Sequence, residues 1–297
     1  MNTKKTFRIT VVIPYYNNAN TIYRALTSVQ NQIYNPLEII IVNDASPDWE
    51  EGKIIIEQFT ELPIKTFSHS ENKNGSAARN TGIKNVMGDW IAFLDADDEW
   101  TETHLESYIL MEPDSEKSLY YCRSLVKSST MQYELPKKGI SREMPVGEYL
   151  FCDKEFIPTP SMFLSKILAS KIMFNEELRR HQDYDFLLRL ERDSVNIVFS
   201  THLGVIVHWE NNNTEAKGGT YEYSYSWARA NRDLFTKKSF GCFINKFVVF
   251  PLLQKRKVVK GLRVFFEDGR IFQNTFKEYY FLMSMILFGE IKLPWKR

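Results

Sequence analysis

Acidic side chains are concentrated directly after one short apolar segment of the chain. The segment Trp90–Leu94 is followed by Asp95, Ala96, Asp97, Asp98 and Glu99. Carboxylates this close repel one another, and a divalent cation with a preference for hard oxygen ligands, Mg²⁺ or Mn²⁺, removes that repulsion. The pattern therefore predicts a metal site at the end of a buried strand. A loop that caps the next helix is the alternative, and it stays open for Asp98 and Glu99.

The elements that position these residues alternate between strand and helix patterns. Between the predicted strands, apolar residues recur at helical spacing over 22–29 and 76–86. Strands that are apolar throughout are typical of a parallel sheet that is covered on both faces. The expected strands are Ile9–Pro14, Leu37–Val42, Ile64–Phe67 and Trp90–Leu94. This is an open α/β unit, whose ligands bind at the carboxyl ends of the strands.

Polar residues collect at all four of those strand ends. In chain order they are Tyr15 and Asn17, then Asp44, then Asn72 and Gly75 just before Arg79, then Asp95 and Asp97. We expect the four turns to face one crevice. The chain contains neither a Gly-x-Gly-x-x-Gly segment after the first strand nor a P-loop sequence, which argues against a dinucleotide oxidoreductase and a P-loop enzyme.

Beyond Trp100 the patterns are weaker. Leu119–Val126 is strand-like, and Lys127–Gly147 is polar and interrupted by prolines, which predicts an exposed, mobile loop. A helix begins near Gln182, Asp183 and Asp185.

Charge and cysteine content bound the class of protein. The 297 residues carry a net charge of +1, but residues 241–297 hold 11 Lys or Arg and 4 Asp or Glu, so that an acidic body precedes a basic tail. The three cysteines follow no metal-ligand pattern, and we expect reduced thiols in a cytosolic protein. The chain starts without a segment of signal-peptide length. Tyr279–Gly289, its longest uncharged stretch near the end, is too short to cross a bilayer.

Together, five segments of the chain resemble the family-2 glycosyltransferases with the GT-A fold. The resemblance extends from Phe7 to Val207 and leaves the last 57 residues unmatched. Its segments are Val11–Asn17, Glu38–Ser46, Asn74–Gly82, Phe93–Asp98 and, more weakly, His181–Leu190. The resemblance implies an open, mostly parallel, Rossmann-like sheet with helices on both faces. We expect a GT-A domain over residues 1–240, with a nucleotide-binding half (1–100) and an acceptor-binding half (101–240), and a mainly helical extension over 241–297.

Such enzymes move a sugar from a nucleotide diphosphate to an acceptor hydroxyl, and the resemblance implies a UDP-sugar or dTDP-sugar donor. A divalent cation, Mn²⁺ or Mg²⁺, stabilises the charge that builds on the leaving diphosphate. Asp97 is then the metal ligand, Asp95 holds the ribose or a metal-bound water, and Asp98 positions the donor or Asp97. His208 is a candidate third metal ligand, with a purely structural role as the alternative.

The expected donor-binding residues are Pro14, Tyr15, Asn17, Asp44, Gly75, Arg79, Asp95, Ala96 and Asp97. Tyr15 would stack on the base, and Asp44 would accept a hydrogen bond from uracil N3–H. Arg79 would pair with the diphosphate or brace Asp44. The alternatives are a turn aromatic for Tyr15, an Asx-turn for Asp44 and a structural ion pair for Arg79. The stretch Asn211–Gly219 is a candidate loop that orders over the bound donor.

Inversion at the anomeric carbon needs a general base for the acceptor hydroxyl. Asp183 matches the family's base, at a helix start whose partial positive charge keeps a carboxylate ionised. A simple cap is the alternative, and Asp185 is the second choice for the base. The family has Glu-Asp where this chain has Gln182-Asp183, so any role of that Glu is in doubt here.

The basic, aromatic-rich tail predicts contact with a membrane surface rather than with nucleic acid. A helical appendage packed on the main domain is the alternative. The full prediction is a metal-dependent, inverting hexosyltransferase of bacterial surface polysaccharide synthesis. It would act on a polyprenyl-diphosphate-linked glycan at the inner face of the cell membrane. The competing functions are a sugar-phosphate nucleotidyltransferase and a non-catalytic partner subunit.

Overall fold

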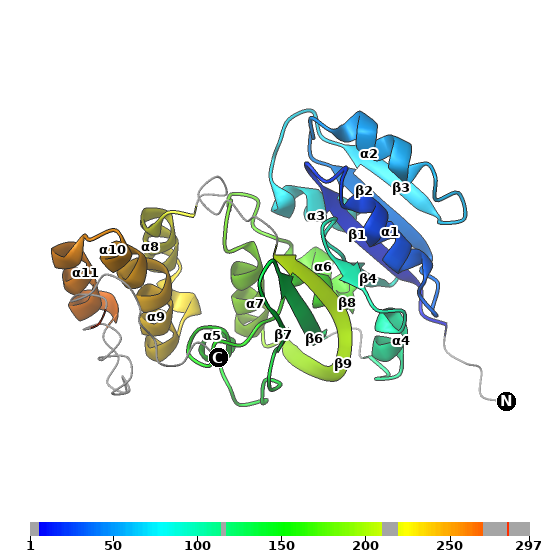
Figure 1. Cartoon of the computed structure of the whole chain (residues 1–297). Coiled ribbons are helices and arrows are strands. Elements are labelled where there is room, and N and C mark those ends of the chain that lie inside the picture. The colour runs from blue at the N-terminus through cyan, green and yellow to red at the C-terminus, as the bar shows by residue number, and fades with distance from the viewer. Residues whose placement is uncertain (1–5, 114–116, 210–218, 270–283, 285–297) are drawn as a thin grey trace. The chain divides into compact units, whose positions relative to one another are not determined.

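The structure is a computed structural model that describes residues 6–113, 117–209, 219–269 and 284 (Figure 1). The chain divides into two compact units, one formed by residues 1–143 and 155–212 and the other by residues 144–154 and 213–297. This division differs from the predicted boundary at residue 240. The reason is that residues on both sides of 240 pack together, as Trp227 does on Phe243 with ring centroids 5.2 Å apart.

In the first unit, the four predicted strands form a parallel sheet. They are β1 (Ile9–Tyr15), β2 (Glu38–Asn43), β3 (Ile64–Ser68) and β4 (Trp90–Phe93). β1 pairs in parallel with both β2 and β4, and β3 pairs in parallel with β2. Their carboxyl ends therefore lie along one edge of the sheet, as the continuous apolar segments predicted.

The later strands make the sheet mixed rather than mostly parallel. They are β5 (Glu99–Trp100), β6 (Ser118–Ser128), β7 (Gln132–Leu135), β8 (Phe163–Ser165) and β9 (Asn196–Trp209). The order is β3-β2-β1-β4-β8-β6-β9-β5, with β7 paired to β6. β8 runs antiparallel to β4 and β6, whereas β9 runs parallel to β6. The loop predicted from residue 127 is wrong in part, since β6 and β7 form an antiparallel pair there.

Helices cover both faces of the sheet. α1 (Ile22–Gln30), α2 (Trp49–Ile56) and α4 (His104–Ile109) contribute to one core cluster with β1, β2 and β4. α3 (Gly75–Asn85) packs on the other face, where an added Cβ at Gly82 would overlap Val12. α6 (Lys166–Ile172) and α7 (Gln182–Arg192) lie on that face too, since Phe174 between them contacts Phe93 of β4 and stacks on Phe186. A 3₁₀ turn, η1 (Thr159–Ser161), precedes β8.

The second unit is helical within its described residues. Its helices are α5 (Val146–Phe151), α8 (Tyr221–Ala230), α9 (Lys237–Ile244), α10 (Phe250–Gln254) and α11 (Val258–Val264). It also contains a 3₁₀ turn, η2 (Arg232–Leu234), and two π-helical segments, η3 (Asn245–Val249) and η4 (Phe265–Gly269). An aromatic core joins them, in which Phe151 of α5 contacts Phe235 and Phe243.

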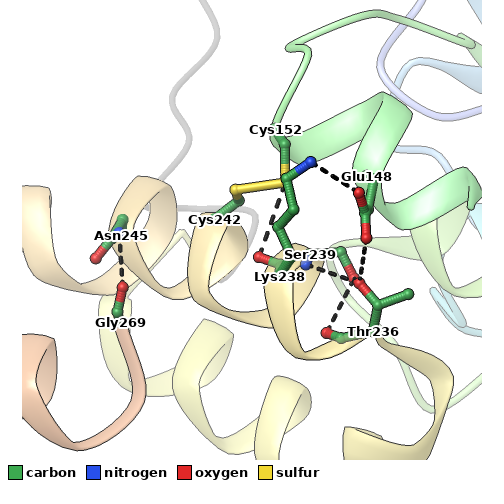
Figure 2. The surroundings of a disulfide bond; sticks show 8 residues. All are labelled: Glu148, Cys152, Thr236, Lys238, Ser239, Cys242, Asn245 and Gly269. Atoms are coloured by element: carbon green, nitrogen blue, oxygen red, sulfur yellow. Dashed lines mark hydrogen bonds and ion pairs between the residues drawn. A yellow bond between two sulfur atoms is a disulfide. The ribbon is translucent and has the colours of Figure 1, made fainter. Parts of the chain in front are cut away.

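A disulfide joins Cys152 to Cys242 in this unit (Figure 2). This corrects the expectation of three reduced thiols, of which only buried Cys122 is free. The pair meets because α5 ends just before Cys152 and packs on α9, with a Cα–Cα distance of 5.4 Å. A separation of 90 residues carries no local signal of this pairing. Beside the bond, Glu148 accepts hydrogen bonds from Thr236 Oγ1 and Lys238 Nζ, both at 2.9 Å (Figure 2).

Within the described part of the chain, no helix combines the length and the hydrophobicity that a membrane span requires. The predicted loop Asn211–Gly219 falls almost wholly, and Tyr279–Gly289 mostly, outside the described residues.

Candidate active site

The turns that bear the predicted site residues contain strained backbone. Asn17, Ala45, Asn74 and His181 all have positive φ, at 56°, 52°, 83° and 63°. They follow β1 and β2 and precede α3 and α7. Non-glycine residues seldom adopt this conformation, which is enriched where function constrains the chain.

Asp44, at the end of β2, is almost fully buried and anchors the turn that leads to α3. Its Oδ1 lies 2.7 Å from His69 Nδ1 and accepts from the backbone N–H of Lys73 at 2.9 Å. Its Oδ2 accepts from the backbone N–H of Asn74 at 2.8 Å. The second ring nitrogen of His69 lies 2.8 Å from Thr81 Oγ1. A carboxylate offers about four lone-pair positions, so these partners leave one for a further donor. Its contact with uracil stays a prediction.

Tyr15 does not offer its ring to a ligand, and the stacking predicted for it is wrong. The side chain is fully buried in the core cluster. Its ring packs edge-on against Trp49 with centroids 5.2 Å apart, and its hydroxyl donates to Asp48 Oδ1 at 3.0 Å. The sequence position alone could not distinguish this residue from its exposed neighbour Tyr16.

The other predicted donor-binding residues lie along the same edge. Pro14 is partly buried in β1, and Asn17 is exposed while its backbone N–H donates to Ser46 Oγ at 2.8 Å. Gly75 begins α3, where an added Cβ would lie 3.1 Å from Arg79 Nη1. Ala96 is buried within the acidic segment.

Arg79 brings the acidic segment and the start of α7 together. Its Nη2 donates to Asp95 Oδ1 at 2.5 Å, and its Nη1 donates to Gln182 Oε1 at 3.2 Å. The guanidinium also lies over the ring of Phe174. Arg79 therefore forms an ion pair with Asp95, and the predicted bracing of Asp44 is wrong. The Arg79 guanidinium is thus fixed between Asp95 and Gln182, which are 87 residues apart in the sequence.

Asp183, the predicted base, lies in the first turn of α7 and is partly buried. Loss of solvation raises its pKa; the nearby Asp95 also raises it, while backbone N–H groups and Arg79 oppose the shift. The prediction that the helix start keeps this carboxylate ionised is therefore incomplete, because desolvation outweighs the favourable contacts. A raised pKa suits a general base, because the pKa of such a base should lie near the working pH.

Asp185, the second choice for the base, is a structural residue. It is buried and accepts from Arg189 Nε at 2.7 Å, one turn along the same helix. Arg189 also donates to the carbonyl oxygens of Ile172 and Met173. This carboxylate is committed to holding α7 against the end of α6.

The acidic segment forms a tight turn after β4. The backbone N–H of Asp98 donates to the carbonyl of Asp95 at 3.0 Å, and Arg24 of α1 donates to the carbonyl of Asp97. The Asp98 side chain is buried, and Oδ1 accepts from the backbone N–H of His208 at 2.8 Å. Burial, together with the charges of Asp97 and Asp95, raises the Asp98 pKa well above its ordinary value.

Neither Asp98 nor Glu99 caps a helix, which was one of the two predicted alternatives. Glu99 belongs to β5 and pairs with Ile206 of β9. α4 begins only at His104, after Thr103. The Asp98 side chain instead fixes the end of β9 to the acidic turn.

His208 lies beside the acidic turn, where the sequence placed it. Its Nε2 lies 2.8 Å from Glu99 Oε1, and Lys127 Nζ lies 3.7 Å from the same oxygen. In the ranges that the structure describes, no three His, Cys, Asp or Glu side chains form a metal-holding group. The carboxylate of Asp97 is a hard donor of the kind that Mg²⁺ and Mn²⁺ prefer. The residues fit such an ion only with oxygens from a bound ligand completing its coordination.

Sequence reasoning missed two residues of this arrangement. His69 contacts Asp44 directly after β3, and attention to the first polar residue after that strand would have found it. Arg24 reaches the acidic turn from α1, and nothing in its helical spacing signals that contact.

Comparison with known proteins agrees with this geometry. The family model described as "Glycosyl transferase family 2" matches residues 10–164. The amylovoran biosynthesis glycosyltransferase AmsB of Erwinia amylovora is 29% identical over 251 residues, which cover 80% of this chain and 83% of AmsB.

Two solved structures resemble the fold. S. aureus TarS 1–349 in complex with UDP-GlcNAc has a TM-score of 0.56 at 15% identity, with 86% of this chain and 87% of TarS covered. The mannosyltransferase PcManGT from Pyrobaculum calidifontis, in complex with GDP-Man and Mn²⁺, has a TM-score of 0.60 at 15% identity. That match covers 94% of this chain and 79% of PcManGT. At 15% identity, these two structural matches show the GT-A fold and nothing more.

Proposed function

Because this chain belongs to glycosyltransferase family 2, we propose that it transfers a sugar from a UDP-sugar or dTDP-sugar to a hydroxyl of a glycan acceptor, with inversion. One observation carries the proposal. Arg79 links Asp95 of the acidic turn to Gln182, the residue next to Asp183. A candidate metal corner and a candidate base thereby share one small site.

On this proposal, the acidic turn and Arg79 receive the diphosphate. Asp97 would hold Mn²⁺ or Mg²⁺ together with phosphate oxygens, and Asp95 would contact the ribose or a metal-bound water. When bound, the ion acts as a Lewis acid and stabilises the negative charge that develops on the leaving diphosphate. Arg79 is paired with Asp95 and would add a second positive charge near the same oxygens. His208, already beside Glu99, is a candidate further ligand.

The part of the site that recognises the nucleobase would lie at the ends of β1 and β2. Asp44 accepts three hydrogen bonds within the chain, and a fourth, from an imide N–H, matches uracil and thymine. Cytosine lacks that hydrogen. The backbones of Pro14, Asn17, Gly75 and Ala96 line the same edge, and their predicted contacts with the donor are part of the proposal.

Asp183 would take the proton of the acceptor hydroxyl as that oxygen attacks the anomeric carbon. Its raised pKa increases its affinity for that proton. Arg79 opposes full neutralisation and so favours the ionised form that a base needs. The proton moves from the acceptor hydroxyl to Asp183 while the bond from sugar to diphosphate breaks.

The described part of the tail supports a membrane-facing role. Around α11, Val259 and Phe266 are 84% and 62% exposed, and Arg256, Lys260 and Arg263 are basic residues of the same stretch. Exposed apolar side chains among cationic ones favour an anionic lipid surface. We place the enzyme on the cytoplasmic face of a bacterial membrane, in surface polysaccharide synthesis, with a polyprenyl-diphosphate-linked acceptor. The name of the relative AmsB, from amylovoran biosynthesis, fits that process.

A panel of nucleotide sugars tests the donor class. UDP-, dTDP-, GDP- and CMP-sugars are compared for Mn²⁺-dependent hydrolysis and for a rise in melting temperature, with EDTA as the control. We expect both responses with at least one UDP- or dTDP-sugar and neither with CMP-sugars. A response confined to GDP-sugars would refute the assignment of Asp44, and no response to any donor would refute the function.

A further inference from the structure

Trp209, the last residue of β9, presents a partly exposed aromatic ring. Its exposed fraction is 41%, the largest of the tryptophans in the described residues. Trp90, Trp100 and Trp227 are at most 5% exposed. A large apolar ring left in solvent costs hydration free energy unless something covers it.

Two other aromatic rings hold this indole in place. Tyr133 of β7 meets it nearly edge-on, with centroids 6.2 Å apart and an interplanar angle of 71°. Phe156 does the same from another segment, at 5.6 Å and 77°. Tyr133 and Phe156 themselves pack against the core cluster of the first unit. Trp209 is therefore supported from within the fold, and this pre-organisation lowers the entropy cost of binding a ligand on it.

The backbone of Trp209 follows the residue that is fixed to the acidic turn. The preceding residue, His208, donates its backbone N–H to buried Asp98 at 2.8 Å. Consecutive Cα atoms are about 3.8 Å apart, so Trp209 lies one residue beyond the point where β9 is fixed to the candidate metal corner. His208 and Trp209 point to opposite faces of the strand. His208 faces Glu99, and Trp209 faces the aromatic pair.

We propose that Trp209 is the platform on which a sugar ring of the acceptor packs. A pyranose has one face of C–H groups, which suits an exposed indole. This inference rests on the proposed glycosyl transfer, and it names a residue that would hold the saccharide acceptor.

Binding is tested directly with methyl glycosides of glucose, galactose, mannose and N-acetylglucosamine as probes. The full-length protein, labelled with ¹⁵N and loaded with UDP and diamagnetic Mg²⁺, is titrated while its indole N–H resonances are recorded. The Trp209 signal is identified by its loss in Trp209→Phe. We expect that signal to shift with at least one glycoside. Shifts only of other indole signals, or no shift with any glycoside, overturn the proposal.

Kinetics separate this site from the donor site. Trp209→Leu should raise the acceptor KM about tenfold, the scale for losing one buried aromatic face. Donor hydrolysis in the absence of acceptor should stay within about twofold, and Trp209→Phe should restore most of the acceptor affinity. Tyr23→Leu is the matched control, because Tyr23 is 56% exposed and packs on Phe59 of the same unit.

The outcomes distinguish a failure of the acceptor role of Trp209 from a failure of the proposed function. Equal losses of donor hydrolysis and transfer in Trp209→Leu would assign the residue to folding or donor binding and overturn the acceptor role. A wild-type protein that hydrolyses no nucleotide sugar would refute the proposed function itself, whatever the indole titration shows.

Discussion

Gln182 accepts a hydrogen bond from Arg79 with one end of its amide and donates two with the other. Its Oε1 lies 3.2 Å from Arg79 Nη1, and its Nε2 donates to the Leu178 carbonyl at 2.7 Å and to Asn74 Oδ1 at 3.2 Å. A glutamate has no donor for the last two contacts. The structure thereby gives a physical reason for glutamine where the family has glutamate.

Gln182→Glu should accordingly destabilise the fold by about 1–3 kcal/mol, because two acceptors would face a carboxylate. The new charge should also raise the pKa of Asp183 further, which moves the acid limb of transfer to higher pH. Denaturant unfolding and a pH–rate profile measure both effects. Gln58→Glu is the matched control, as exposed Gln58, just after α2, makes a similar bond to the Ile54 carbonyl. Equal stability of the two variants would contradict this explanation.

Asp183→Asn should reduce transfer by about 10²–10⁴-fold, the usual contribution of a general base, and leave donor binding nearly intact. Because burial raises the folded-state pKa, the folded protein binds this proton more tightly than the unfolded chain. The carboxylate thus lowers stability increasingly as pH rises through the folded pKa. At neutral pH the variant should be at least as stable as the wild type.

Asp185→Asn provides the contrast within the same helix. It removes the charge that pairs with Arg189 at 2.7 Å, so we expect a loss of about 1–3 kcal/mol in the free energy of unfolding. Melting curves and single-turnover transfer separate the two variants. Near-normal transfer by Asp183→Asn would rule out Asp183 as the base.

Asp98→Ala should loosen the end of β9. It leaves the backbone N–H of His208 without its acceptor, at a cost of about 1–3 kcal/mol. Asp98→Asn keeps an acceptor and resembles the neutral form that the raised pKa favours, so its stability should stay close to that of the wild type. Hydrogen exchange at His208 and denaturant unfolding report the difference. Equal protection in the two variants would argue against the tether.

Reduction should release two thiols and lower the melting temperature. Under denaturing conditions, the untreated protein should show one reactive thiol, Cys122, and the reduced protein three. A bond that closes a long loop contributes about 2–4 kcal/mol by constraining the unfolded chain. Cys242→Ser should match the reduced wild type, with Cys122→Ser as the control that keeps the bond. Three reactive thiols in non-reduced protein would disprove the pairing.

Local pattern predicted the first half of the fold well. The segments around Val11, Ile40 and Ile91 are apolar without alternation, and burial on both faces of a parallel sheet requires this. Since parallel strands end at one edge, the sequence alone assigns Asp44 and Asp95 to one edge of the sheet.

Long-range packing decided what the sequence could not show. Tyr15 and Tyr16 are chemically alike, and the core contacts that bury Tyr15, among them the ring of Trp49, come from distant parts of the chain. The contact of Asp98 with His208 spans 110 residues, and nothing local distinguishes a carboxylate that tethers a strand from one that caps a helix. The disulfide depends in the same way on two helices meeting.

The metal corner at Asp97 is the centre of this account, and UDP binding measured by calorimetry tests it most directly. Wild-type protein and Asp97→Asn are each titrated with UDP in Mn²⁺ and in EDTA. We predict that Mn²⁺ tightens UDP binding to the wild type by at least about tenfold, or 1.4 kcal/mol, and changes it little in Asp97→Asn. The same UDP affinity in Mn²⁺ and EDTA for the wild type, or an undiminished Mn²⁺ effect in Asp97→Asn, would contradict the assignment of this carboxylate.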